Sequence, residues 1–582
     1  MKAVILFVSC LFTVYGFTQI TFTVTAPASI AGAYDFTSNG DGTDWGLANL
    51  LDPADAVLDT LVLVDDGTPG INAQGIPLAN EGCGPLVNDL TGKIAVVYRY
   101  DGSSSNVCWY GTKVLNAQNA GAVGVIMINR EDGLIDVPGT TDGPLTNIPF
   151  AFISKSDGAL LRARIDAGDD VVAFIGNKLG LYPYDAGIVK KSTLIPSISA
   201  STVQLAQSAT EFGFDLGSTI YNYGINDLNN VELTATVTGP GGTWTQTAGP
   251  YTIVAGDSLD VLTGGANPIP AYSQASYPAG WYNLTYSLDI GAADDALFDN
   301  ALSFDFVLTD SLISYARLDP VSNLPRNTYE TRSSGTNFAS CIAFQNPNAS
   351  RLAVKGLYFA AYVLWSSTAL LTGEVMELNL YQWDDVFTDL NDPNFAMDNL
   401  TPLSFGYYIY EDDLQGEMVY GALESPVQFA DNQRYLACVQ TSNPDIWMGF
   451  DNGVNYTRNI GHYLQAQNPI STDGVYYALG FGEKLTSTIS MSVFDAADLS
   501  VDENELEGLI YPNPAQDQVT LSLAGTINGS IEMYDVTGRL LSQATIENES
   551  LIQLNTHHLA PGSYRLLVRS DAGNSSFQFV KQ

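Results

Sequence analysis

The chain has 582 residues, too many for one hydrophobic core, so its length predicts about three to five domains. Only 15% of the residues are charged, but acidic residues outnumber basic ones 63 to 23, for a formal net charge of -40. A surface this acidic repels phosphate backbones and anionic lipid headgroups, which argues against nucleic acid and membrane surfaces as partners.

The first 18 residues have the pattern of a secretory signal peptide. Lys2 precedes an apolar run over residues 3–14, and Gly16 lies near a small-residue cleavage position. The alternative, that Cys10 is a lipoprotein cysteine, would leave a very short apolar segment. No later stretch reaches the ~18 uninterrupted apolar residues of a membrane-spanning helix, so we expect no transmembrane segment.

Removal of the signal peptide leaves four cysteines: Cys83, Cys108, Cys341 and Cys438. In an exported chain four cysteines predict two disulfides, and three pairings are open at this point.

Residues 83–168 alternate strand and helix patterns. The β-branched runs 94–98 and 123–128 are bounded by glycine and predict two buried strands with a short Ala-rich helix between them. A second helix is predicted by Ser154 as N-cap, Asp157 three residues later and Gly168 at the end.

Together with Cys83-Gly84-Pro85, these residues resemble a protease-associated (PA) domain, a small α/β module found in secreted peptidases and receptors. The resemblance covers residues 19–180. It implies a Cys83–Cys108 disulfide and a role in binding a protein or a peptidase substrate. Within it, residues 39–44 predict a turn rather than a calcium loop, because the terminal Glu of an EF-hand is missing.

Two β-rich segments follow. Strict alternation over 231–238 and 282–290 is typical of half-buried antiparallel strands, and residues 186–309 resemble an immunoglobulin-like or fibronectin-like sandwich. Short alternating strands separated by long loops over residues 311–497 predict a jelly-roll-like sandwich. Cys341 and Cys438 both lie in this second segment, so one disulfide per domain is the economical assignment. We expect the acidic loop Asp294, Asp295 and Asp299 to be solvated.

An acidic linker, residues 498–508, is expected to be extended and open to a processing protease. Residues 509–582 then carry motifs at Tyr511–Pro514, Asp535–Arg539 and Pro561–Tyr564. We expect Pro512 and Pro514 to restrict the backbone, and Gly538 and Gly562 to supply permissive turns.

These motifs resemble the C-terminal sorting domain of type IX secretion cargo, known from the Bacteroidetes. The resemblance implies a small β-sandwich that is recognised by the type IX machinery after the signal peptide has delivered the chain to the periplasm. It predicts an extracellular or outer-surface location. The sorting signal it assigns consists of Pro512, Asn513, Pro514, Asp535, Gly538, Arg539, Gly562 and Tyr564.

The sequence offers little catalytic chemistry. It has no His-Glu-x-x-His zinc motif and no Gly-x-Ser-x-Gly elbow. Its histidines are His462 and the pair His557 and His558, which lie in the tail. We interpret His462 as structural, assign no catalytic residue and no metal ligand, and favour a chain that is not an enzyme.

Two further groups are candidates for binding. Calcium would suit the oxygen-rich loop Asp389, Asn391, Asp392, Asn394 and Asp398, but we favour a solvated loop there, and no other cofactor is expected. We expect six aromatic side chains of the jelly-roll segment to pack in the core, with stacking on a glycan as the alternative: Trp365, Trp383, Trp447, Tyr407, Tyr408 and Tyr410.

The sequence therefore predicts a mainly β, multidomain, secreted or surface-exposed binding protein, exported by the type IX machinery, with an extracellular protein or glycan as ligand. Two alternatives remain open. One is an extracellular hydrolase, either a divergent peptidase or a glycan hydrolase. The other is a non-catalytic accessory subunit of a secreted peptidase.

Overall fold

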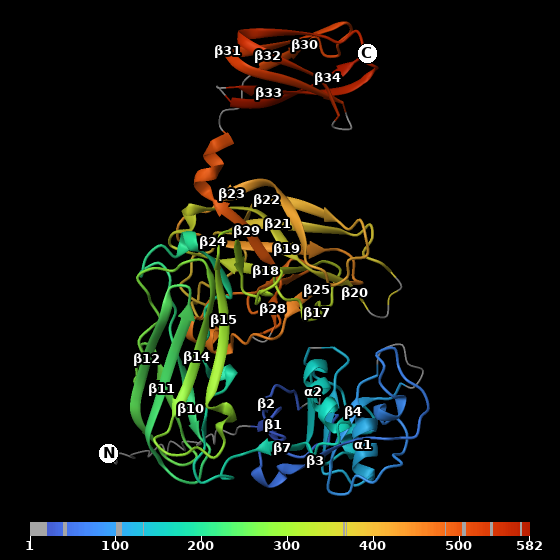
Figure 1. Cartoon of the computed structure of the whole chain (residues 1–582), viewed down its shortest axis with the longest axis vertical. Helices are drawn as coiled ribbons and strands as arrows, with labels where there is room; N and C mark the ends of the chain where they lie inside the picture. Colours follow the sequence, from blue (N-terminus) through green and yellow to red (C-terminus); the bar gives the residue numbers. More distant parts are fainter. Residues whose placement is uncertain are drawn as a thin grey trace, which may run out of the picture. The chain divides into compact units, whose positions relative to one another are not determined.

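A computed structural model describes residues 20–38, 44–100, 107–131, 133–364, 367, 369–482, 485–502, 508–535, 539–570 and 573–582. The signal peptide, residues 39–43 of the predicted turn, Trp365, residues 503–507 of the predicted linker and Gly538 lie outside the described residues. The described residues up to Phe494 form one compact unit, and those from Asp495 onward form a second. Both are built mainly from β-strands (Figure 1).

The chain begins with the α/β module predicted from its sequence. Its sheet has the order β2-β1-β7-β3-β4-β5-β6. The strands are β1 (Ile20–Ala26), β2 (Gly32–Tyr34), β3 (Val57–Leu63), β4 (Ile94–Tyr98), β5 (Gly124–Ile128), β6 (Phe150–Ile153) and β7 (Val172–Asn177). From β3 to β6 the strands are parallel, whereas β7 is antiparallel to β3 and β1. Parallel strands are buried on both faces, which is why β4 and β5 are continuous apolar runs.

The two predicted helices are α1 (Tyr110–Asn119) and α2 (Lys155–Asp166), and they contribute to separate apolar clusters on the sheet. Ser154 caps α2 as expected, because its hydroxyl accepts a hydrogen bond from the Asp157 backbone N–H at 3.0 Å. Gly168 follows the helix with φ +85°, a left-handed conformation that favours glycine. Short 3-10 helices lie in the connections: η1 (Pro53–Asp55), η2 (Leu78–Glu81) and η3 (Gly143–Leu145).

One long sheet contains strands from both β-rich segments, 186–309 and 311–497. Its order is β12-β11-β14-β15-β9-β16-β29-β19-β23. The strands are β9 (Ala200–Thr202), β11 (Leu228–Gly239), β12 (Gly242–Ile253), β14 (Gly280–Asp289), β15 (Ala301–Thr309), β16 (Leu312–Ser314), β19 (Leu352–Phe359), β23 (Val419–Gln428) and β29 (Ser490–Asp495). The segments 186–309 and 311–497, separated by their sequence patterns, thus share one hydrogen-bonded sheet.

Smaller sheets complete these segments. Opposite the first half of the long sheet lie β8 (Ala186–Gly187), β10 (Gly217–Asn222) and β13 (Ser258–Leu262). A sheet with the order β22-β21-β24-β18-β26-β27 faces the second half across the largest apolar cluster. Its strands are β18 (Phe338–Phe344), β21 (Val375–Trp383), β22 (Leu400–Ile409), β24 (Arg434–Thr441), β26 (Ile470–Thr472) and β27 (Val475–Tyr477).

The remaining elements of this unit are short. The strands β17 (Tyr329–Thr331), β20 (Ala361–Val363) and β28 (Thr486–Ser487) pair with β25 (Ile446–Asp451), and the helix α3 (Thr457–Tyr463) follows β25. The 3-10 helices are η4 (Lys190–Ser192), η5 (Val203–Leu205), η6 (Leu297–Asp299) and η7 (Ala349–Arg351).

The acidic loop at 294–299 differs from its prediction. Asp294 accepts a hydrogen bond from the Ala186 N–H, and Asp295 accepts one from the Tyr184 N–H, both at 3.0 Å. Asp299 is buried. The loop is not simply solvated, because its carboxylates bind backbone amides of the chain that enters β8.

The linker at the start of the second unit also differs from its prediction. The 3-10 helix η8 (Ala496–Asp502) occupies the start of the linker that was expected to be extended. The Asp495 carboxylate accepts a hydrogen bond from the Ala497 N–H at 2.9 Å, and this contact helps to start the helix. An acidic composition therefore did not exclude local helix formation.

The tail is built of β-strands, as predicted, and its five strands form one hydrogen-bonded sheet around an apolar core. Its strands are β30 (Gly508–Tyr511), β31 (Gln518–Asp535), β32 (Leu540–Asn555), β33 (Gly562–Ser570) and β34 (Gly573–Lys581). The order is β30-β31-β33-β34, and β32 also pairs with β31. The last strand is tied to the start of the domain, because the Ala515 N–H donates to the Val580 carbonyl at 2.7 Å and the Gln582 N–H to the Ala515 carbonyl at 2.9 Å.

Candidate functional site

The four cysteines form the two expected disulfides. Cys83–Cys108 lies in the α/β module, and Cys341–Cys438 joins directly opposed residues of β18 and β24. The second bond lies in a small apolar cluster on the outer face of its sheet. Both disulfides cross-link packed parts of the fold, so these cysteines are not available as nucleophiles.

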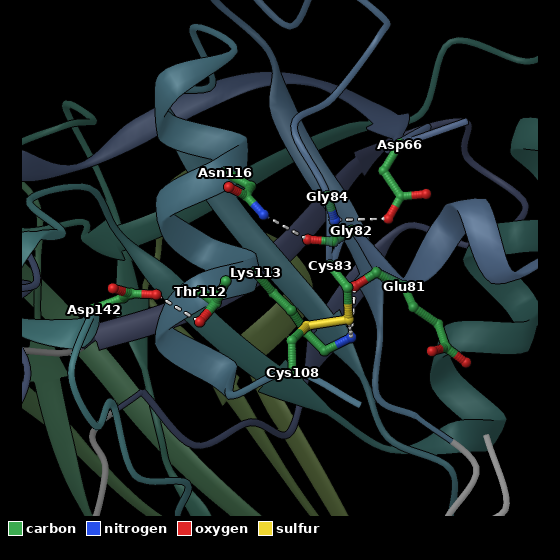
Figure 2. The surroundings of a disulfide bond; sticks show 10 residues. All are labelled: Asp66, Glu81, Gly82, Cys83, Gly84, Cys108, Thr112, Lys113, Asn116 and Asp142. Carbon is green, nitrogen blue, oxygen red and sulfur yellow. Dashed lines mark hydrogen bonds between the residues drawn. A yellow bond between two sulfur atoms is a disulfide. The ribbon is translucent and has the colours of Figure 1, made fainter. Parts of the chain in front are cut away.

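A buried lysine supports the first disulfide. Figure 2 shows Lys113 extending from α1 past the disulfide, where its ammonium donates to the Glu81 carbonyl at 2.5 Å. Asn116, one turn later, donates to the Gly82 carbonyl at 3.0 Å. Burial lowers the pKa of Lys113 to about 8, although the nearby Glu81 carboxylate opposes this shift. The arrangement fixes the turn that carries Cys83.

His462 has a structural environment. Its Nε2 lies 2.8 Å from the Asp215 carboxylate, and its ring packs edge-on against Tyr463. Tyr463 in turn accepts a hydrogen bond from the Asp215 N–H at 2.8 Å. The His462–Asp215 pair joins α3 to the segment before β10, and no hydroxyl among the described residues is hydrogen-bonded to His462.

Within the described ranges, no group of three or more His, Cys, Asp or Glu side chains could hold a metal ion. In the oxygen-rich loop, Asp392 accepts from the backbone amides of Thr388 and Asn394, and Asp389 accepts from that of Asn391. These carboxylates are engaged in turns of their own loop.

Most of the candidate aromatic residues pack inward. Trp383 is 2% exposed and donates its indole N–H to the Ala396 carbonyl at 3.0 Å, while Tyr410 is 1% exposed. Tyr408 is half-buried against the main core, and Trp447 is half-buried on β25. Tyr407 is the exception, because 60% of its side chain is exposed.

Tyr407 belongs to an exposed apolar surface on β21 and β22. We define the aromatic patch as the residues Val375, Phe405, Tyr407 and Ile409, all of them exposed large hydrophobic side chains. Ile409 pairs with Val375 across the two strands, and the rings of Phe405 and Tyr407 lie 6.0 Å apart at 68°. Strand alternation places these side chains on one face, while Ser404 and Gly406 point to the other.

The patch combines apolar rings with polar neighbours. Glu377 lies opposite Tyr407, and Asn379 lies opposite Phe405, both on the same face of β21. Phe405, Ile409 and Val375 were not among the candidates from the sequence. The alternating apolar residues in 403–409 predict a strand with these side chains on one face. Alternation alone does not say which of the two faces is solvent-exposed.

A polar cavity lies between the α/β module and the segment around β17. It is a cavity of about 380 Å³ lined by Arg130, Glu131, Lys155, Asn327, Thr328, Glu330 and Tyr362. Glu131 and Arg130 form an ion pair of 2.6 Å. Burial, and then the charge of Glu131, raise the pKa of Glu330 to about 7, while Arg130 opposes the shift.

The sorting-signal residues lie at both ends of the tail's strands. Asn513 accepts a hydrogen bond from the Val580 N–H at 2.9 Å, and Arg539 pairs with Asp535 at 3.2 Å. The Tyr564 hydroxyl donates to the Ala560 carbonyl at 2.7 Å. Gly562 does not have the predicted role, because it begins β33 without a left-handed φ.

Comparison with known families agrees with this geometry at both ends of the chain. The family model of the PA domain matches residues 57–161. The chain contains a PA domain. β1, β2 and β7 pair into the same sheet as the matched strands, so the α/β module that contains the match spans residues 20–177. The family model of the secretion system C-terminal sorting domain matches residues 509–582.

The sorting domain indicates export to the extracellular or cell-surface space, and it implies contact with the secretion machinery. Among the described residues, no helix is long and apolar enough to cross a membrane. With its PA domain and sorting domain, the protein is a secreted, multidomain, mainly β protein.

Similar proteins share only part of the chain. Aminopeptidase YwaD of Bacillus subtilis is 32% identical over 121 residues, which are 20% of this chain and 25% of the relative. This chain thus spans about a quarter of that relative's length.

Solved structures show weaker similarity. The aminopeptidase from Aneurinibacillus sp. strain AM-1 is 22% identical, with 27% of this chain and 30% of that chain covered and a TM-score of 0.19. The Ruminococcus gnavus β-glucuronidase is 11% identical, with 49% and 38% covered and a TM-score of 0.14. With TM-scores this low, neither structure bears on the function of this chain.

The raised pKa of Glu330 predicts a pH dependence of stability. Between its ordinary value of 4.5 and about 7 the folded state holds a proton that the unfolded state has lost. Stability should therefore fall as pH rises through this window, by about 1–2 kcal/mol after allowance for partial exposure. Glu330→Gln should flatten the profile, and thermal melts at pH 4 and pH 8 would measure it. A variant whose pH profile equals that of the wild type would contradict the assignment.

The sorting domain predicts the consequence of deleting it. Because the residues up to Phe494 form their own compact unit, a chain without 509–582 should fold and accumulate in the periplasm. Fractionation of cells that express the truncated and the full chain would measure this, with protease resistance as the folding control. We also expect the exported form to end within or near 495–508. Export of the truncated chain at the same level as the full chain would contradict the prediction.

Proposed function

We propose that this protein acts outside the cell by binding, and that the aromatic patch on β21 and β22 is its ligand surface. The observation that supports this most is the exposure of Phe405, Tyr407 and Ile409 together on one strand. Contiguous exposed apolar side chains on a soluble protein commonly mark an interaction surface. The patch lies on the sheet that carries the Cys341–Cys438 disulfide, which gives it a rigid support.

The proposed ligand is a neutral glycan. Flat rings with a polar partner at their edge suit a sugar ring, whose face is apolar and whose rim carries hydroxyls. Glu377 and Asn379, opposite the two rings, offer hydrogen-bond acceptors and a donor at that rim. The net charge of -40 disfavours acidic polysaccharides, because their carboxylates or sulfates would be repelled.

The environment of His462 supports binding over catalysis. A hydrolytic Ser-His-Asp arrangement needs a hydroxyl on the second imidazole nitrogen, and among the described residues no hydroxyl is hydrogen-bonded to His462.

A second candidate is an accessory role for the PA domain beside a secreted peptidase. It rests on the identity of 32% with an aminopeptidase over 121 residues. The mixed charges of the cavity at Arg130, Glu131 and Lys155 would suit a peptide that carries both signs of charge. The two roles use different surfaces, so their tests are independent.

The binding proposal predicts that Tyr407→Ala combined with Phe405→Ala weakens binding to neutral polysaccharide about tenfold or more, because two stacking rings are removed. Affinity electrophoresis or calorimetry with the purified mature chain would measure this. Tyr477→Ala is the matched control, since Tyr477 is 52% exposed on β27 at the other end of the same sheet. Binding that survives the double substitution, or falls equally with the control, would contradict the assignment.

A further inference from the structure

A lysine and two aspartates are buried together where the PA sheet ends. Lys178 directly follows β7, Asp185 directly precedes β8, and Asp299 ends η6. The Lys178 Nζ lies 2.6 Å from Asp185 Oδ1 and 2.7 Å from Asp299 Oδ2. The side chains of the three residues are 1%, 0% and 5% exposed, so bulk water does not reach the cluster.

The walls of this cluster are aromatic. The Lys178 Nζ lies 4.5 Å from the centre of the Tyr223 ring and 4.8 Å from that of Phe298. Gly187 forms another wall, because a Cβ at this position would lie 2.0 Å from Asp299 Oδ2. Only glycine allows the carboxylate to approach this closely. The site holds an amine and two carboxyl groups in contact, without room to separate.

The charges of the cluster do not balance. Two carboxylates and one ammonium leave a net negative charge in a site from which water is excluded, and such a charge is costly to bury. Asp185 Oδ2 is buried and has no hydrogen-bond partner within the described ranges. Burial raises the pKa of Asp185 to about 7, Lys178 opposes the shift, and Asp299 and Asp294 add to it. Asp185 is therefore the group that keeps a proton.

We propose that Lys178 and Asp185 condense to an intramolecular amide, an isopeptide bond, with Asp299 as the acid–base group. Nζ and the carboxyl oxygen are already within 2.6 Å, and a protonated carboxyl group is a better electrophile than a carboxylate. Holding both reactants in one geometry removes much of the entropic barrier to such a step.

The atoms balance without an external reactant. The Asp299 carboxylate takes one proton from the Lys178 ammonium, and the neutral amine attacks Cγ of protonated Asp185. The tetrahedral adduct loses its second N–H proton and expels hydroxide, which together leave as one water molecule. Asp299 keeps the proton it accepted. The products are an amide, water and a neutral carboxylic acid, so the buried charges are gone.

Denaturing tryptic digestion of the purified mature chain, with mass spectrometry, tests the proposal. An acylated lysine is not cleaved by trypsin, so we expect a peptide spanning 165–190 that is uncut at Lys178 and lighter than its sequence by one water. Full cleavage after Lys178 would overturn the proposal. So would a loss of water with Lys178 still cleavable, which marks a succinimide elsewhere. A branched Lys178–Asp299 peptide would overturn the assignment of roles.

Two variants separate the chemistry from mere proximity. Asp299→Asn keeps Lys178 and Asp185 but removes the acid–base group, and it should restore both the water and the cleavage after Lys178. Asp59→Asn is the matched control, because Asp59 pairs with Lys93 at 2.9 Å in a solvent-exposed site and should not affect the cross-link. The wild-type peptide decides the proposal by itself, even if Asp299→Asn does not fold.

Discussion

Backbone hydrogen bonds between short strands join the two β-rich segments, 186–309 and 311–497, in one sheet. Ala200 of β9 pairs with Val307 of β15 on one side and with Ser314 of β16 on the other, and β16 pairs with β29. The hydrogen-bonded sheet therefore runs without a break from one segment into the next. Buried backbone groups need such partners, so the segments cannot separate without leaving amides and carbonyls unsatisfied.

Side chains reinforce the same junction. Asn459 of α3 both accepts from the Ile195 N–H and donates to the Ile195 carbonyl, at 3.1 and 2.8 Å, as a strand neighbour would. Arg351 forms two hydrogen bonds with the Glu211 carboxylate, at 2.8 and 3.0 Å. His462 and Asp215 belong to this set as well. His462, the histidine considered as a catalytic candidate, is thus part of the connection between the two β segments.

The sequence predicted those parts of the structure that local pattern controls. Continuous β-branched runs marked β4 and β5, and the Ser154 cap marked α2, because each depends on neighbouring residues only. The motifs at Pro512 and Tyr564 marked the sorting domain. The boundary near residue 310 was harder to interpret, because pairing between distant short strands leaves no local pattern.

The sites were less predictable for the same reason. An alternating strand has two faces, and only the packing of β22 against its neighbours decides that Phe405 and Tyr407 face solvent. Asp299 was interpreted as a solvated residue, since nothing near it in sequence shows that Lys178 lies against it. Burial, and then the charge of Glu131, raise the pKa of Glu330, and Glu131 is far away along the chain.

Residues 186–494 form one body, and this body supports the aromatic patch. Native-state hydrogen exchange of the mature chain, measured by mass spectrometry over a denaturant series, tests this claim most directly. The shared sheet predicts that peptides from β11 and β14 lose protection at the same denaturant concentration as peptides from β18 and β24. Loss of protection in β11 and β14 at a clearly lower concentration, with β18 and β24 still protected, would contradict the claim.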